Sequence, residues 1–377
     1  MNESITSLNG KRKQTRSAVY QYLYNARSPR PKLTISKDLD ISMPTVYQNV
    51  DELLEAGLIE YCGMQRSSGG RPAAQLRTVD GARYAIGLYI TPHDIHISAT
   101  DLSRTEIAYR RIAHNYEPAS PESITFITNE LENYIDGNHI PRDRLLGVGI
   151  VLPGVIDPEE NTLLYAPTLK LRDRDLRPLR SAIPYPTHVE NDATSGGFAE
   201  WYNSRERNAI AYMTLAEGVG GTILVNGALY AGNNNRSGEF GHMCIEWNGK
   251  PCSCGKRGCL EAYLSTRRFR EELGIDVEEF FFRLKNGDPS VLPFWNEYKR
   301  YLVMGIHNIR LSLDCDVVLG GLLAEYLEPY LDELRSMVME SNPFDAQSTF
   351  LRIDRHPRFG SIIGAAFYFI RDFIDSI

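Results

Sequence analysis

Apolar residues recur at helical spacing in three short segments within the first 83 positions, and an alternating, hairpin-like stretch follows them. The apolar positions are Val19, Tyr20 and Leu23 in the first segment and Ile35 and Leu39 in the second. The proline-containing run 27–31 ends the first segment. The dozen residues before it are polar and basic, and they predict a flexible arm.

A third helix is predicted to begin at Ser42, a favourable N-cap residue, with Pro44 in its first turn. Its apolar stripe consists of Val46, Val50, Leu53 and Leu54. Asp40 occupies the preceding tight turn, where an Asp tolerates left-handed geometry. Three short helices with such a turn before the last predict a helix-turn-helix that places its third helix in the major groove. The residues predicted to face DNA are Pro44, Thr45, Gln48 and Asn49.

The stretch after the third helix predicts a hairpin with a basic, glycine-rich tip. Gly57–Tyr61 and Ala74–Val79 are the expected strands, and the tip contains Arg66 and Arg71. These two arginines are expected to reach phosphates or a narrow minor groove, as in a winged helix-turn-helix. The alternative for residues 1–83 is a helical oligomerisation module with an ordinary hairpin.

Residues 84–377 alternate predicted strands and helices, which indicates an α/β body. Tyr84–Ile90 and Ile95–Asp101 predict a first hairpin, and Leu146–Leu152 predicts a buried strand. Ser120 is expected to start an amphipathic helix. We therefore predict two domains, a winged head at 1–83 and a body at 84–377.

Three of the six cysteines, Cys252, Cys254 and Cys259, lie within eight residues, and His242 lies ten residues upstream of the first. Thiolate and imidazole are the ligands that zinc prefers, and four of them suit a closed tetrahedral site. The spacing predicts one structural Zn²⁺ rather than a catalytic one, because no coordination position stays open for water. The alternative is three free thiols and a core histidine.

The charge is unevenly distributed over the 377 residues. Residues 1–83 hold 12 Lys+Arg and 8 Asp+Glu, a net charge of +4, whereas the remainder holds 29 and 40, a net charge of −11. A basic head on an acidic body favours a nucleic-acid partner for the head alone. The chain has no apolar run long enough to span a membrane and no signal peptide, and its cysteines are clustered, so we expect a cytoplasmic location without a membrane partner.

The motif G-E-F-G-H at 238–242, followed by C-S-C-G-K-R-G-C-L-E at 252–261, resembles the signature of the ROK family of sugar-responsive repressors and sugar kinases. The resemblance implies that Glu239, His242 and Glu261 bind sugar hydroxyls, with His242 also ligating zinc. It implies a body of two actin-like lobes with sugar in the cleft, and a last helix, Ser361–Phe373, that packs back on the first lobe. The winged head is similar to that of the repressor branch of the family.

Asn191 and Asp192 end a short predicted strand at 188–190, where α/β sheets bind ligands. The residues alone also allow an ordinary turn. In the kinases of the family, the residue matching Asp192 is the base that deprotonates the sugar. Together with Glu239, His242 and Glu261, the pair makes a polar set suited to a polyol.

The nucleotide-binding loops depart from the pattern of the kinases. A first loop of the form D-x-G-G-T is replaced by 89–93, where Tyr89 stands in place of the acid and Pro92 has no N–H to donate to phosphate. In the second glycine loop, Glu217 places a negative charge where an anion would lie. Only the pair Gly320-Gly321 remains as the family has it. We therefore predict that the chain neither binds nor uses ATP and is not an enzyme.

These features predict a sugar-responsive transcriptional regulator, most simply a repressor of carbohydrate-utilisation genes such as those of xylose metabolism. Its expected partners are a double-stranded DNA operator, a small-molecule sugar effector and a second copy of the chain, in a homodimer or higher homo-oligomer. The alternative is a ROK-type sugar kinase with a regulatory DNA-binding head. A third possibility is a repressor whose body binds a transport protein instead of a sugar.

Overall fold

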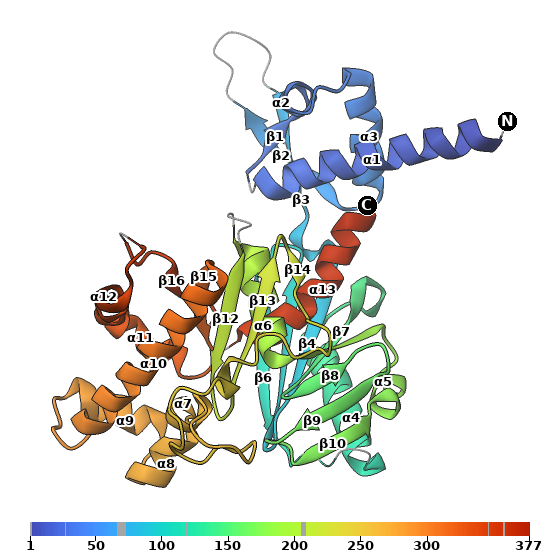
Figure 1. Cartoon of the computed structure of the whole chain (residues 1–377). Helices are drawn as coiled ribbons and strands as arrows, with labels where there is room; N and C mark the ends of the chain where they lie inside the picture. The colour runs from blue at the N-terminus through green and yellow to red at the C-terminus, as the bar shows by residue number, and fades with distance from the viewer. Residues whose placement is uncertain are drawn as a thin grey trace.

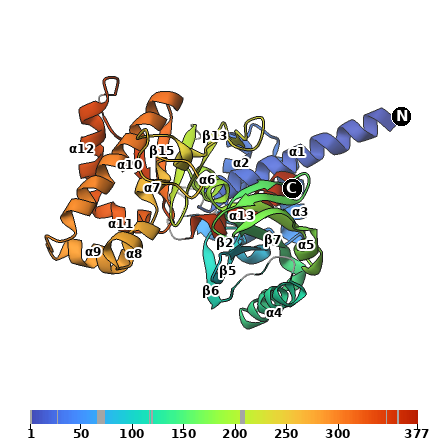
Figure 2. The ribbon, with the colours of Figure 1, turned by 60° about the horizontal axis from the view of Figure 1, so that its bottom comes forward.

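The computed structural model describes residues 2–26, 28–65, 73–115, 117, 120–204, 209–345, 347–356 and 359–377. It has a small helical head above a larger body of two α/β lobes (Figure 1). This arrangement confirms the predicted fold class, a helix-turn-helix head followed by a two-lobed body. Figure 2 shows that the helices of the second lobe lie on the face of its sheet that points away from the first lobe.

The described residues of the head form three α-helices and a three-stranded sheet of order β1-β3-β2. Its elements are α1 (Asn2–Ala26), β1 (Arg30–Pro31), α2 (Lys32–Asp38), α3 (Met43–Glu55), β2 (Ile59–Gln65) and β3 (Ala73–Thr78). The predicted turn is present, since Asp40 has a φ of 52°. The Ser42 hydroxyl accepts a hydrogen bond from the Thr45 N–H and caps α3 as expected.

The prediction of a flexible arm over the first dozen residues is wrong, because α1 begins at Asn2. No proline interrupts the segment, and its end is tied to the third helix. Arg12 Nε donates to Glu52 Oε1 at 2.9 Å, and Arg16 Nη1 donates to Glu52 Oε2 at 3.4 Å. These contacts lower the pKa of Glu52, with the Arg12 hydrogen bond as the main cause.

The first lobe is built on a mixed sheet of order β11-β7-β4-β5-β6, in which β4, β7 and β11 run parallel. Its strands are β4 (Tyr84–Ile90), β5 (Asp94–Asp101), β6 (Glu106–Ala113), β7 (Leu145–Leu152) and β11 (Thr187–Asn191). One face is covered by α4 (Pro121–Gly137) and α5 (Arg177–Ala182). Beside it lies a small sheet of β8 (Val155–Asp157), β9 (Thr162–Ala166) and β10 (Leu171–Asp175).

The second lobe is built on a sheet of order β14-β13-β12-β15-β16. Its strands are β12 (Ile210–Leu215), β13 (Val219–Val225), β14 (Ala228–Leu229), β15 (Asp316–Gly320) and β16 (Leu351–Ile353). An aromatic-rich cluster around Phe269, Phe280 and Tyr298 joins this sheet to the helices outside it. Those helices are α7 (Glu261–Leu264), α8 (Arg267–Leu273), α9 (Val277–Lys285), α10 (Leu292–Leu313), α11 (Ala324–Leu327) and α12 (Leu331–Ser341).

Two helices, α6 (Asp192–Asn203) and α13 (Gly360–Ser376), pack along one another between the two sheets (Figure 1). Glycines on the first-lobe sheet allow α13 to approach closely, since a Cβ on Gly87 would lie 2.0 Å from Ile362 O and one on Gly149 would lie 2.4 Å from Ala365 O. In the structure, α13 packs on β4, β7 and β5 of the first-lobe sheet.

The far end of α13 reaches the head. Arg16 of α1 donates from Nε and Nη2 to Ile377 O at 3.2 and 3.1 Å. Tyr20 of α1 and Ile374 of α13 belong to one buried apolar cluster that spans head and body. The predicted domain boundary between residues 83 and 84 stays a prediction, although β4 does begin at Tyr84. None of the helices in the described ranges has the length and apolar content that a membrane crossing requires.

Candidate functional site

The end of β11 and the start of α6 hold the predicted pair Asn191 and Asp192. The Asn191 Oδ1 accepts from the N–H groups of Ala193 and Thr194 at 2.8 and 3.0 Å, which caps α6. Its Nδ2 donates to Gly154 O at 2.7 Å and to Asp192 Oδ1 at 3.1 Å. Every hydrogen-bonding position of the Asn191 amide is therefore in use, so this residue orients Asp192 and the start of the helix.

Asp192 has a partner that the sequence did not reveal. The Tyr89 hydroxyl, from the end of β4, donates to Asp192 Oδ2 at 3.1 Å. Burial raises the pKa of the Asp192 carboxyl, and the hydrogen bond from Tyr89 opposes that rise. The residue that replaces the acid of the first nucleotide loop thus contacts the carboxylate that matches the base of the kinases.

Glu239 and His242 lie at the two ends of a short 3₁₀ turn, η3 (Phe240–His242). The His242 Nε2 is 4.0 Å from Glu239 Oε2. Removal from water raises the pKa of Glu239, His242 lowers it, and the charges of Asp192 and Glu261 raise it further. The fold therefore brings these three carboxylates, which span 70 residues of sequence, into one electrostatic group.

Glu261 occupies the first turn of α7, and its side chain is buried. Its Oε2 accepts from the Val219 N–H at 3.1 Å, and its Oε1 accepts from the Ser253 hydroxyl. Arg267 Nη2 lies 3.4 Å from the same Oε1. Ser253 stands between two of the clustered cysteines, so the cysteine loop and the carboxylate are in direct contact.

The ligand atoms of His242, Cys252, Cys254 and Cys259 all lie within 4.8 Å of one another. The His242 Nδ1 is 3.8 Å from Cys252 Sγ, and Cys254 Sγ is 3.8 Å from Cys259 Sγ. Burial, together with the neighbouring thiols, raises the pKa of Cys259 to about 12. Three thiols and an imidazole crowded around one point are the arrangement expected of a metal-ligand set.

The two nucleotide-loop segments use their backbone donors internally. In the first, the Thr91 hydroxyl accepts from the N–H groups of His93 and Asp94 at 3.4 and 3.0 Å. In the second, the Val219 N–H donates to the Glu261 carboxylate, as described above. Burial is the main reason that the pKa of the Tyr89 hydroxyl is raised, and the charges of Asp192 and, to a smaller extent, Glu217 raise it further.

The exposed surface of the helix-turn-helix includes Pro44 and Gln48, and Thr45 is half-buried. Two residues on this surface were missed. Tyr47 is 50% exposed, and Lys32 Nζ lies 4.0 Å above its ring. Tyr47 follows Pro44 by three positions, so a helical projection of α3 identifies it. The surface offers a cation, an amide and an aromatic ring.

The prediction that Asn49 faces DNA is wrong. Asn49 is 2% exposed, and its Nδ2 donates to Thr45 O at 2.7 Å. Because α1 and α2 both pack against α3, the buried stripe includes Asn49, whereas Leu54 is only half-buried. Arg66 and Arg71 of the predicted wing tip lie outside the described residues, while the strands that lead to it pair antiparallel as expected.

The chain was compared with known proteins. The family model described as "ROK family" matches residues 85–371, and one described as "Helix-turn-helix domain" matches residues 14–62. The xylose repressor of Bacillus spizizenii is 28% identical over 325 residues, covering 84% of this chain and 80% of the relative.

Solved structures share the fold. A ROK family transcriptional regulator described as a homologue of the Escherichia coli MLC protein superposes with a TM-score of 0.75 at 21% identity, covering 97% of both chains. A ROK family glucokinase from Streptomyces griseus, solved with glucose and AMPPNP, superposes with a TM-score of 0.65 at 21% identity. That likeness covers 76% of this chain and 98% of the glucokinase. The regulator superposition extends over the head, whereas the kinase corresponds to the body.

Proposed function

The chain belongs to the ROK family, and from that premise we propose that it is a sugar-responsive DNA-binding repressor of carbohydrate-utilisation genes. The observation that carries the proposal is the physical connection of two binding elements. A helix-turn-helix head packs on the end of α13, and the start of that helix lies beside the first residues of α6, where Asp192 sits. A sugar that changes the lobe arrangement therefore has a direct mechanical route to the head.

The sugar site consists of Asp192, Glu239, His242 and Glu261, with Asn191 holding Asp192 in position. Ionised carboxylates accept strong hydrogen bonds from hydroxyls, and several of them around one cleft suit a polyol. The name of the Bacillus spizizenii relative makes xylose the first sugar to test.

We propose that this body binds its sugar without phosphorylating it. The Tyr89 hydroxyl donates to the Asp192 carboxylate, which opposes its use as a base. The internal use of the loop donors leaves few N–H groups for phosphates, and Glu217 adds an unfavourable charge. At about 4 Å, two like charges near a protein surface repel by roughly 4 kcal/mol.

We propose that His242, Cys252, Cys254 and Cys259 hold one structural Zn²⁺ per chain. The chemistry of the donors fits the ion, since three thiols and an imidazole lie within reach of one centre. When bound, zinc would hold thiolates at neutral pH and tie the loop of Glu239 to the helix of Glu261. The residues of the chain that touch the sugar would then be fixed in relation to one another.

The head is proposed to bind operator DNA as part of a homodimer, because helix-turn-helix proteins read paired half-sites. Pro44, Thr45 and Gln48 are the proposed contacts from α3, and Tyr47 with Lys32 joins them. Arg66 and Arg71 remain the proposed phosphate or minor-groove contacts of the wing.

A thermal-shift screen of sugars, beginning with xylose, tests the proposal on the full-length protein. A ligand that binds only the native state raises the melting temperature in a concentration-dependent way. The sugar that does so should also change the affinity of the protein for its operator in an electrophoretic or anisotropy assay. If no sugar raised the melting temperature and the protein captured a sugar-transport protein, the result would favour a repressor whose body binds a transport protein.

The kinase alternative is tested with the same sugar. Calorimetry should detect sugar binding and no binding of ATP with magnesium, and a coupled assay of ADP release should stay at background. Turnover that Asp192→Asn abolishes would overturn the regulator-only proposal.

A further inference from the structure

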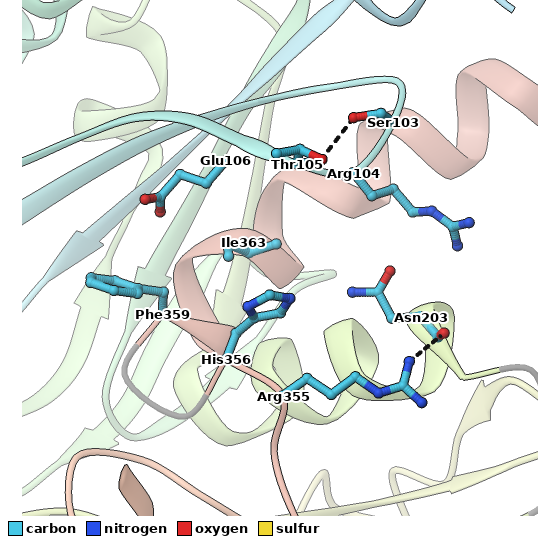
Figure 3. A pocket seen from close by; sticks show the side chains of 9 residues that line it. All are labelled: Ser103, Arg104, Thr105, Glu106, Asn203, Arg355, His356, Phe359 and Ile363. Atoms are coloured by element: carbon cyan, nitrogen blue, oxygen red, sulfur yellow. Dashed lines mark hydrogen bonds between the residues drawn. The ribbon is translucent and has the colours of Figure 1, made fainter. Parts of the chain in front are cut away.

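A cavity of about 410 Å³ is lined by none of the residues of the proposed sugar site. It opens where β5 turns into β6, at the end of the first-lobe sheet opposite to the Tyr89 end of β4. Figure 3 shows its lining side chains converging from three segments. The lining residues are Ser103, Arg104, Thr105, Glu106, Asn203, Arg355, His356, Phe359 and Ile363.

The cavity lies beside the two segments, here called crossings, in which the chain passes from one lobe to the other. Asn203 is the last residue of α6, shortly before the chain enters β12 of the second lobe. Arg355 and His356 follow β16 of the second lobe, just before the chain returns through α13. Arg355 Nη1 donates to Asn203 O at 2.8 Å, so the two crossings already touch (Figure 3).

The lining is rich in cationic donors. The guanidinium groups of Arg104 and Arg355 lie on either side of Asn203, and the His356 ring lies between them and Phe359 (Figure 3). Arg104 Nη1 donates a hydrogen bond to Tyr202 O at 2.8 Å. The buried Nε–H of Arg104 has no hydrogen-bond partner among the described residues.

One carboxylate of the lining, that of Glu106, is engaged elsewhere. The Ser98 hydroxyl donates to Glu106 Oε2 at 2.8 Å. Two guanidinium groups and an imidazole line the cavity with that carboxylate. The buried Glu200, which pairs with Arg352 at 2.8 Å, also lies 3.9 Å from Arg355 Nε. This balance favours an anionic ligand, and arginine forks match the oxygens of phosphate.

We propose that this cavity is a second effector site that binds a small phosphomonoester. A phosphomonoester carries about −1.5 to −2 charges near neutral pH, which suits two arginines better than a single carboxylate does. The volume falls within the range of about 300–1,000 Å³ typical of small-molecule sites, so it has room for a carbon skeleton beside the phosphate. Phe359 and Ile363 supply an apolar wall for that skeleton.

A ligand here would act on the head as well as on the lobes. The Arg104 guanidinium lies 5.2 Å from the ring centroid of Tyr24, in α1 of the head, and 5.0 Å from that of Tyr202 in α6. A phosphate that draws Arg104 toward the cavity would alter this stacked contact. The site thus joins both lobe crossings and the DNA-binding head.

Calorimetry on the full-length protein tests the proposal with ribose 5-phosphate, inorganic phosphate and ribose as probes. Ribose 5-phosphate should bind saturably at one site per chain, phosphate more weakly, and ribose not at this site. Arg355→Gln should raise the Kd of ribose 5-phosphate at least about tenfold, because a charge-assisted hydrogen bond is lost. Arg174→Gln, an equal charge change on exposed β10, should leave the Kd unchanged.

A second variant, at an exposed position, tests the cavity even if Arg355→Gln does not fold. Thr105 is exposed, so Thr105→Glu should preserve the fold while placing a repelling carboxylate at the cavity. Asp192→Asn, in the sugar cleft, should leave ribose 5-phosphate binding intact, which separates this site from the proposed sugar site. The proposal is overturned if neither phosphate probe binds at millimolar concentration, if both cavity variants bind like the wild type, or if Asp192→Asn alone abolishes binding.

Discussion

Replacing Asp192 by Asn should weaken sugar binding and leave the stability of the fold almost unchanged. Asp192 Oδ1 accepts from the Ala193 N–H at 2.9 Å, and Asn retains an oxygen for that bond. The new amide nitrogen would face the Tyr89 hydroxyl, which can accept a hydrogen bond as readily as it donates one. No buried polar group loses its partner, so the free energy of unfolding should change by less than about 1 kcal/mol.

The sugar affinity should respond more strongly. A hydrogen bond from a hydroxyl to an ionised acceptor contributes about 1.5–3 kcal/mol, so its loss should raise the Kd of the sugar by about ten- to a hundredfold. Isothermal calorimetry measures this change, and thermal unfolding of the same samples measures stability. An unchanged Kd would refute the assignment of Asp192 to the sugar site, whereas a large loss of stability would refute the account of its hydrogen bonds.

The pH dependence supplies an independent check. The folded pKa of Asp192 is raised, so the native protein binds a proton before the unfolded chain does as the pH falls. The wild type should therefore gain stability relative to Asp192→Asn as the pH is lowered from neutrality toward the usual range of an aspartate carboxyl. Below both pKa values the difference should become constant. A wild type that loses stability relative to the variant over that interval would contradict the sign of the shift.

Three further predictions concern the metal, the packing of α13 and the DNA contact. Cys254→Ser should remove zinc, measured by elemental analysis, and weaken sugar binding, whereas Cys62→Ser in the head should retain one ion per chain. Gly87→Ala should cost at least about 2 kcal/mol in unfolding experiments, because the new Cβ meets a backbone carbonyl, whereas Gly137→Ala has nothing within 4 Å and should change stability by less than about 0.5 kcal/mol; equal losses would contradict the close approach of the helix. Gln48→Ala should change operator preference without changing the salt dependence of binding, which anisotropy titrations on matched and mismatched DNA can measure.

The sequence predicted local elements well where short-range signals decide them. Ser42 and Ser120 cap α3 and α4 as expected, since N-cap chemistry depends only on a few neighbouring residues. The burial of Asn49 could not be predicted from such local signals. Whether a polar residue at the edge of an apolar stripe is buried depends on how many helices pack on it, and that information is not local.

The candidate site shows the same division. The cysteine spacing placed four ligand atoms together because the loop between them is short. The contact of Tyr89 with Asp192 joins residues 103 positions apart, and only the pairing of β4, β7 and β11 brings their ends together. The cavity around Arg104 and Arg355 likewise could not be predicted from the sequence. It forms where the β5–β6 turn meets two segments that connect the lobes and lie far apart in the sequence.

The position of α13 has a consequence for how the protein is made. Translation proceeds at about 5–20 residues per second, and domains generally fold as they emerge. The helix that covers the first-lobe sheet and contacts the head is synthesised after every other described element of the fold. A nascent chain can therefore hold a folded head that is not yet docked on its body. Premature stop codons before α13 would release chains of that kind, which could occupy an operator but would not respond to the effector.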